Sequence, residues 1–198
     1  MRKIIVSNIV SLDGYSAGPG GDVMALPMDE AFDAYNAERL RTAGTLLLGR
    51  VSYLGFQSYW PGIADAPEDP ANRALTPDNR EISRRNNAID KLVVSDTLTA
   101  AGTDAWRDTT EIVGRADAVA RISALKRQGD GDILVFGSGT MWNALIADGL
   151  VDEVHLMVGP VVLGDGVPAF RTPPKRLRLL EARTFEGSDN VLHQYATT

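Results

Sequence analysis

Cysteine is absent from the 198-residue chain. Its absence excludes a disulfide framework, a thiolate metal site and a cysteine nucleophile, so redox chemistry would have to come from a bound cofactor. Histidine is scarce: His155 and His193 are far apart, and neither lies near a cluster of histidines or carboxylates with metal-ligand spacing. We therefore expect no metal. The serines lack a Gly-x-Ser-x-Gly elbow, which leaves no support for a nucleophilic triad.

The chain also has fewer basic than acidic residues and contains no long apolar run. Lysine and arginine number 20 against 26 aspartates and glutamates, which gives a net charge of −6 and an isoelectric point near 4.9. This balance disfavours a nucleic-acid binder, which normally needs a concentrated basic face. No stretch approaches a membrane span, and the apolar run in MRKIIVSNIVSLDG is too short for a signal peptide. We expect a cytoplasmic protein that binds neither nucleic acid nor membrane.

What the chain does contain is the composition of an ordinary soluble globular protein. Apolar residues make up 44% of the sequence and charged residues 23%. A length of 198 residues suits one domain whose core needs no disulfide or metal. We therefore expect a single domain over residues 1–198.

Strand-like and helix-like segments alternate along most of the chain. Short β-branched or leucine-rich runs predict buried strands at residues 3–10, 45–48, 91–95, 111–113, 133–136 and 153–158. Apolar residues at helical spacing predict helices at residues 28–43, from 49–52 to 60–62, and at 117–128 and 141–148, and a polar helix is expected at 79–87. Two strand-like runs at residues 176–185 and 191–196 surround a turn cluster and predict an antiparallel hairpin. The expected fold class is α/β, a mixed and mostly parallel sheet of about eight strands flanked by four or five helices.

Residues 132–150, DILVFGSGTMWNALIADGL, join an apolar run to an amphipathic helix through a glycine-rich turn. A strand that leads into Gly137 and Gly139 presents bare backbone N–H groups at a helix N-terminus, where the helix dipole attracts a phosphate. Glycines at such a junction are also common as plain turn residues. The pattern therefore gains weight only from partners elsewhere in the chain.

Three strand ends carry groups that can hold a phosphate or a ribose. They are Gly49-Arg50-Val51-Ser52, Ser95-Asp96-Thr97 and Gly137-Ser138-Gly139-Thr140. Ligands of an open sheet bind beyond the carboxyl ends of the strands, so three such ends can converge on one extended ligand, for which a dinucleotide is the natural candidate. Arg50 offers a cationic fork suited to phosphate. Each residue alone is better explained as a cap, a turn residue or a solvated side chain, but their joint placement reverses that balance.

Five separated stretches carry a resemblance to a known family: SLDGY at 11–15, LGRVSY at 48–53, VS at 94–95, VFGSGT at 135–140 and GPVVLGDG at 159–166. They resemble the dihydrofolate reductase-like superfamily. Within it, they are similar to the reductase domain of the bacterial bifunctional riboflavin-biosynthesis deaminase/reductase and its stand-alone relatives. The resemblance spans nearly the whole chain and keeps the order of elements, including the closing hairpin. It implies the corresponding fold and an NADPH site.

The resemblance also implies which residues meet the cofactor. Gly49, Arg50 and Ser52 would contact the adenosine phosphate and the pyrophosphate. Ser95 would contact the adenosine side, and the glycine-rich turn at 137–140 would contact the pyrophosphate. Arg115, just past another strand, would add charge near a 2′-phosphate, and paired arginines favour NADPH over NADH. The residues implied to bind NADPH are Gly49, Arg50, Ser52, Ser95, Arg115, Gly137, Ser138, Gly139 and Thr140.

The substrate side is less defined. In dihydrofolate reductases a carboxylate on the first helix recognises the pterin and supports its protonation, and this chain has Asp29, Glu30 and Asp33 there. Asp13 matches the Ser-x-Asp-Gly stretch of the riboflavin-type reductases, where the loop borders nicotinamide and substrate. An aspartate before Gly14 is as readily a turn residue. Asp13 and Asp29 are the candidate catalytic residues.

Aromatic side chains are the candidates for stacking on a planar substrate. Because buried aromatics more often belong to the core, we expect only a subset to touch ligand. The candidates are Tyr15, Phe32, Tyr53 and Trp60.

The leading hypothesis is an NADPH-dependent reductase that transfers hydride to a small planar heterocyclic or carbonyl substrate, such as a pteridine or a pyrimidine. A ribosylaminopyrimidine of riboflavin biosynthesis is less favoured, because the chain has no deaminase zinc signature. The alternative is a non-catalytic dimeric nucleotide-binding or scaffold protein that retains the fold. A homodimer is expected by resemblance, through residues 150–170, whose VHLMVGPVVLG run is unusually apolar for an exposed edge; an interior strand is the other explanation.

Overall fold

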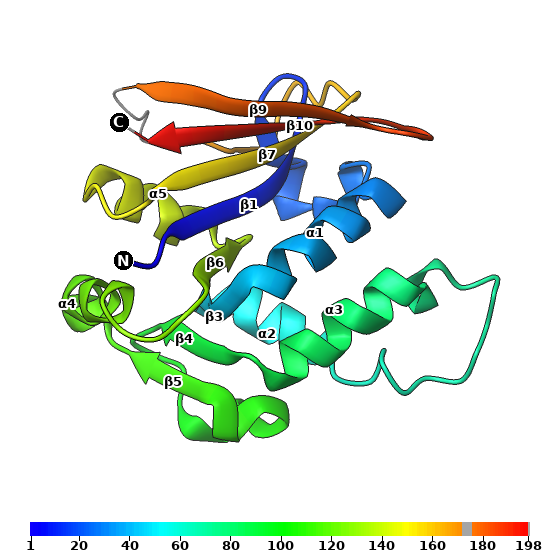
Figure 1. The fold of residues 1–198 in the computed structure, drawn as a ribbon. Helices are drawn as coiled ribbons and strands as arrows, with labels where there is room; N and C mark the ends of the chain where they lie inside the picture. The colour runs from blue at the N-terminus through cyan, green and yellow to red at the C-terminus, as the bar shows by residue number, and fades with distance from the viewer. Residues whose placement is uncertain (172–175, 198) are drawn as a thin grey trace. The chain divides into compact units, whose positions relative to one another are not determined.

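The computed structural model describes residues 1–171 and 176–197, which divide into two compact units (Figure 1). Unit 1 comprises Met1–Arg2 and Asp33–Ser138, and unit 2 comprises Lys3–Phe32 and Gly139–Thr198. The expectation of one domain over residues 1–198 stays a prediction. Each unit has its own strands and its own helical cover, and each is described by itself below.

Unit 1 is built on four parallel strands: β3 (Ala43–Gly49), β4 (Asp90–Val94), β5 (Thr110–Val113) and β6 (Asp132–Phe136). Their order across the sheet is β5-β4-β3-β6. Leu46, Leu47 and Leu48 in the centre of β3 have no exposed surface. A continuous apolar run of this kind is typical of a parallel strand that helices cover on both faces.

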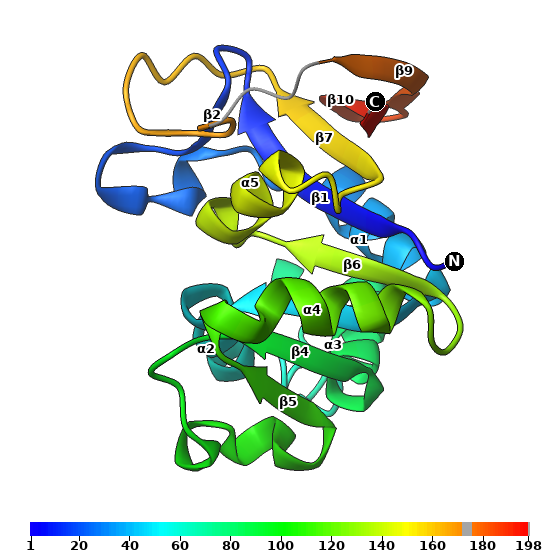
Figure 2. The ribbon, with the colours of Figure 1, turned by 90° about the vertical axis from the view of Figure 1, so that its left-hand side faces the viewer.

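Helices lie on both faces of this sheet (Figures 1 and 2). α4 (Arg115–Lys126) covers one face, and α2 (Arg50–Tyr59) and α3 (Pro77–Ala88) cover the other. α1 (Glu30–Thr42) contributes its residues from Asp33 onward to this unit. The sequence explains where α3 begins, because the Thr76 hydroxyl accepts the Asn79 N–H over 3.3 Å and a proline occupies the first turn.

Unit 2 holds β1 (Ile4–Ser11), β7 (Glu153–Gly159), β10 (Ser188–Thr197) and β9 (Leu177–Phe185), in that order across the sheet. β1 and β7 are parallel, whereas β10 is antiparallel to both β7 and β9. α5 (Gly139–Ala147) lies on one face of these strands (Figure 2). A separate ribbon pairs β2 (Tyr15–Ala17) with β8 (Val167–Pro168).

β7 has a hydrogen-bonded partner strand on each side. Burial inside the sheet therefore explains the apolar VHLMVG run, which belongs to an interior strand rather than to an exposed edge. The homodimer stays a prediction, without this segment as its support.

The expected fold class is confirmed: over the described residues the chain forms a mixed, mostly parallel sheet of eight strands with five α-helices and a C-terminal antiparallel pair. β2 and β8 were not expected, because strands of 3 and 2 residues are too short to show a hydrophobic period. Within residues 1–171 and 176–197, no helix is both long enough and apolar enough to cross a membrane.

Candidate functional site

The carboxyl ends of the four unit 1 strands form one level edge. Gly49 at the end of β3 pairs with Val94 at the end of β4, and Val94 pairs with Val113 at the end of β5. The register between β3 and β6 brings Gly137 to the level of Gly49. The residues that follow the strands therefore lie side by side. This edge brings together the sequence-predicted residues Gly49, Arg50, Ser52, Ser95, Arg115, Gly137 and Ser138.

The first turn of α2 is open to an anion. Its N-cap residue, Gly49, makes no side-chain hydrogen bond to the first N–H groups of the helix. Uncapped amides and the helix dipole together favour negative charge at this position. Arg50 follows with an exposed side chain that has no hydrogen-bond or ion-pair partner among the described residues. The end of β3 thus combines an uncapped helix with a cation that is not already paired.

Two serines fasten the end of β3 to the end of β6. The Ser138 N–H donates to the Ser52 Oγ over 2.9 Å, and the Gly49 N–H donates to the Ser138 Oγ over 3.0 Å. Gly137 lies between them with a φ of 55°, in the left-handed region, and a Cβ there would lie 2.9 Å from the Ser52 Oγ. Only glycine fits this close approach without strain. The side chains of Ser52 and Ser138 therefore shape the turn.

The ends of β4 and β5 are joined by the carboxylate of Asp96, which lies in the Ser95-Asp96-Thr97 stretch but is not among the residues implied to bind NADPH. Asp96 accepts the Arg115 backbone N–H over 2.8 Å, and its other oxygen lies 3.3 Å from the Arg115 Nε. Ser95 is buried, and its hydroxyl oxygen accepts the N–H groups of Thr97 and Leu98. The Arg115 side chain is 81% exposed and that of Asp96 is 53% exposed.

Gly139 and Thr140 begin α5 and belong to unit 2. The Gly139 carbonyl accepts the Asn143 Nδ2 over 2.8 Å, and the Thr140 Oγ1 accepts the Arg171 Nη1 over 3.0 Å. The Asn143 Oδ1 in turn accepts the Arg171 backbone N–H. The start of α5 is thereby fixed within its own unit, with an arginine side chain beside Thr140.

Asp13 anchors one loop of unit 2 to another. Its carboxylate accepts the Ser11 hydroxyl at 2.7 Å and the backbone N–H groups of Leu163 and Gly164 at 3.1 and 2.7 Å. The hydrogen bond from Ser11, supported by the two amides, lowers the pKa of Asp13 from 3.8 to about 2. The carboxylate is consequently ionised at neutral pH.

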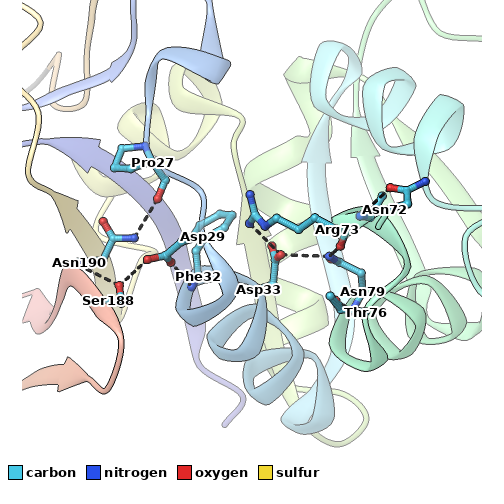
Figure 3. Close-up of polar contacts among 11 residues, drawn as sticks. Pro27, Asp29, Phe32, Asp33, Asn72, Arg73, Thr76, Asn79, Ser188 and Asn190 are labelled. Carbon is cyan, nitrogen blue, oxygen red and sulfur yellow. Dashed lines mark hydrogen bonds and ion pairs between the residues drawn. The ribbon is translucent and has the colours of Figure 1, made fainter. Parts of the chain in front are cut away.

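Asp29 stands at the start of α1, where one of its oxygens accepts the Phe32 N–H over 3.0 Å (Figure 3). Its other oxygen accepts the Ser188 hydroxyl, whose oxygen accepts the Asn190 N–H. The Asn190 side chain closes the cluster by donating to the Pro27 carbonyl. Both oxygens of Asp29 are thus engaged in fixing the first turn of the helix.

Asp33, on α1 within unit 1, accepts the Arg73 Nη2 and the Asn79 Nδ2, each over 3.0 Å (Figure 3). Of the three carboxylates at the start of this helix, Glu30 alone is exposed. The sequence alone does not tell which of these three carboxylates is exposed and which are bonded to other parts of the chain, because their spacing along the helix fits either case.

The aromatic candidates differ in burial. Tyr53 has no exposed surface: its hydroxyl lies 3.0 Å from the Thr110 Oγ1 and its ring packs edge-on against Trp106. Trp60 is partly exposed and packs edge-on against Tyr59, with ring centroids 4.8 Å apart. In unit 2, Phe32 and Tyr15 are also partly exposed. Tyr53 therefore has no free ring face in this conformation, whereas the other three rings keep some exposed surface.

A cavity of about 500 Å³ lies at the amino ends of the unit 1 strands, opposite the strand ends described above. It is lined by residues at the amino ends of β3, β4 and β5, among them Thr45, Lys91 and Thr110. Because the strands are parallel, this cavity and the strand ends that carry Arg50 and Gly137 lie at opposite edges of one sheet.

The sequence matches one family model. The model of the RibD C-terminal domain matches residues 2–192. The uncharacterized protein YyaP of Bacillus subtilis (strain 168) is 30% identical over 188 residues, which cover 94% of this chain and 90% of YyaP.

The fold is similar to that of solved structures. A putative riboflavin biosynthesis protein from Shewanella sp. PV-4 superposes with a TM-score of 0.67 at 20% identity, over 99% of each chain. The dihydrofolate reductase from Enterococcus faecalis, complexed with NADP(H) and RAB-propyl, superposes with a TM-score of 0.59 at 13% identity, over 99% of this chain and 96% of the reductase. At these identities the likeness shows a shared fold, that of the dihydrofolate reductases.

Proposed function

Because the chain belongs to the RibD C-terminal domain family, we propose that it is an NADPH-dependent reductase of a small planar heterocyclic or carbonyl compound, such as a pteridine or a pyrimidine. The family and the fold support a reductase of the dihydrofolate reductase-like kind. The cofactor and the substrate class are the further steps of the proposal.

The observation that carries the proposal is the level row of strand ends in unit 1. Adjacent strands lie about 4.8 Å apart, so four ends span roughly 14 Å, a length that suits an extended dinucleotide. Within that row the uncapped start of α2 and the unpaired Arg50 suit a pyrophosphate. Gly137 is itself exposed, so its backbone is accessible beside them.

The chain's own contribution would be to bind and orient. Arg50 and the first N–H groups of α2 would hold the pyrophosphate, with Ser52 and Ser138 fixing the turn that borders it. Arg115, at the end of β5, would meet the charge of a phosphate monoester on the adenosine ribose. That Gly139 and Thr140, at the start of α5 in unit 2, contact phosphate stays a prediction. NADPH supplies the hydride when bound.

Asp13 and Asp29 would act by position in this proposal. A general acid must hold a proton at the working pH, and Asp13, with its pKa near 2, does not. Its anchoring of residues 163–164 would keep the substrate-side loop ordered, and Asp29 would fix the start of α1 in the same way. The proton that completes a reduction would then come from another group or from water.

The test is turnover with a panel of acceptors. Purified protein is mixed with NADPH and dihydropteridine, pyrimidine or simple carbonyl compounds, and the loss of NADPH absorbance is followed. The proposal expects saturable oxidation with at least one acceptor class, weakened by Arg50→Ala. NADPH binding without oxidation of any acceptor would instead favour a non-catalytic nucleotide-binding protein.

A further inference from the structure

Asp96 introduces a negative charge into a row of strand ends that otherwise carries cations. β4 lies between β3 and β5, so Asp96 follows the strand between those that lead to Arg50 and Arg115. Asp96 contacts Arg115 and not Arg50: its carboxylate accepts the Arg115 backbone N–H over 2.8 Å and lies 3.3 Å from the Arg115 Nε. Arg50 has no such partner among the residues that the structure describes.

The location of the pair matters because of where a dinucleotide would extend. A pyrophosphate at the start of α2 leaves one nucleoside to lie over β4 and β5, one and two strand spacings away, or roughly 5 and 10 Å. The ribose attached to that pyrophosphate can therefore lie beside the ends of β4 and β5. Asp96 and Arg115, with side chains 53% and 81% exposed, are then the charged groups beside its hydroxyls.

NADPH and NADH differ at that ribose by one phosphate. An arginine fork attracts the 2′-phosphate, whereas a carboxylate accepts a hydrogen bond from the 2′-hydroxyl of NADH and repels the phosphate of NADPH. The pair therefore offers a partner to each cofactor. Its ion pair also offsets part of the charge that Arg115 could direct at a phosphate.

We propose that Asp96 is a specificity-determining residue that reduces the preference of this site for NADPH over NADH, so that the chain uses either cofactor. This inference rests on the proposed function. It makes Arg115 the group that favours NADPH and Asp96 the group that limits the preference.

The experiment compares the dissociation constants of NADPH and NADH, measured by quenching of tryptophan fluorescence. Asp96→Asn keeps an oxygen that can accept the Arg115 N–H but removes the charge. It is expected to increase the NADPH preference, taken as the ratio of the two constants, by about tenfold. Arg115→Gln is expected to decrease the same ratio by a similar factor, chiefly through weaker NADPH binding.

Asp117→Asn is the matched control. Asp117 is an exposed carboxylate in the first turn of α4, and its substitution removes one negative charge close to the same strand end. The ratio in this variant should stay within about twofold of the wild type. Because each ratio is internal to one protein, partial loss of folding cancels.

The outcomes separate the two proposals. A wild type that binds neither cofactor overturns the proposed function together with this inference. A wild type that binds NADPH, with a ratio that Asp96→Asn leaves unchanged or that Asp117→Asn shifts equally, overturns the role of Asp96 alone. A selective shift in Asp96→Asn, opposed by Arg115→Gln, supports it.

Discussion

Ser52 and Ser138 are joined by a hydrogen bond in which the Ser138 N–H donates to the Ser52 Oγ over 2.9 Å. The Ser138 Oγ accepts the Gly49 N–H over 3.0 Å in return. The first turn of α2 and the turn after β6 are therefore linked in both directions. This linkage holds two strand ends of unit 1 at a fixed spacing.

Ser52→Ala should loosen that spacing. The substitution leaves the partly buried Ser138 N–H without its acceptor, so we expect a loss of about 1 kcal/mol in the free energy of unfolding and weaker NADPH binding. Urea unfolding and a fluorescence titration measure the two effects. The control is Ser58→Ala, because the Ser58 hydroxyl on the same helix is exposed and, within the described part of the chain, donates only to the Gly55 carbonyl. Equal behaviour of the two variants would contradict a special role for Ser52.

Gly137→Ala should lower the stability of the protein more than an ordinary glycine substitution does. Its φ of 55° strains any L residue, and its Cβ would also lie 2.9 Å from the Ser52 Oγ. Gly149→Ala is the matched control, because Gly149 has a φ of 67° and nothing within 4 Å of the added Cβ.

We expect the control to lose about 1 kcal/mol of stability in urea unfolding and Gly137→Ala to lose more. An equal loss would mean that the Ser52 side chain simply moves aside.

The sequence could predict most of the fold because each long element carries its own period. The leucines of β3 and the β-branched run of β1 predict strands, and the helix expected at 117–128 is α4, which begins two residues earlier at Arg115. Registers are a different matter. That Gly49 lies level with Val94 depends on long-range pairing, which no local pattern contains.

Lys91 should make stability depend on pH in the alkaline range. Its side chain is buried, with the Nζ donating to the Ile89 carbonyl and the Thr109 hydroxyl and lying 4.5 Å from the centre of the Trp106 ring. Burial lowers its pKa from 10.5 to about 8. Between these values the unfolded chain binds more protons than the folded one, so stability should rise as the pH increases through this window.

Urea unfolding at several pH values between about 8 and 10 tests this expectation in the wild type and in Lys91→Met. The methionine has no proton to lose, so the part of the slope that belongs to Lys91 should vanish, while tyrosine titration persists in both proteins. Identical slopes would show that the amine is more hydrated than its contacts indicate.

Asp13 should keep its charge far into acid. With its pKa lowered from 3.8 to about 2, the carboxylate contributes stability above the higher value and loses it as the pH falls through the lower one. The amide proton of Gly164, which donates to this carboxylate over 2.7 Å, reports the change in an NMR titration.

We expect the Gly164 midpoint near pH 2, and its absence in Asp13→Asn. Asp165→Asn is the control, since among the described residues the Asp165 carboxylate accepts only the neighbouring Gly166 N–H, and it lies outside the anchor. A midpoint near the ordinary value of 3.8 would contradict the anchor.

The candidate site was harder to predict than the fold, for reasons visible in single residues. Glycine and charge patterns indicated the strand ends that carry Arg50 and Gly137. Nothing in the sequence distinguishes Tyr53, which is fully buried, from Trp60, which is partly exposed. Asp96 follows Ser95 directly, yet its contact with Arg115 spans 19 positions and appears only once β4 and β5 are paired.

The central claim is that the level strand ends of unit 1 form a dinucleotide site. Its most direct test is a titration of NADPH against the wild type, Arg50→Ala and Arg84→Ala, followed by tryptophan fluorescence. Arg84 is an exposed arginine on α3, away from the strand ends, and controls for net charge. The account predicts saturable binding by the wild type and Arg84→Ala and at least a roughly tenfold weaker affinity in Arg50→Ala. Absence of saturation in the wild type, or equal affinities in all three proteins, would contradict it.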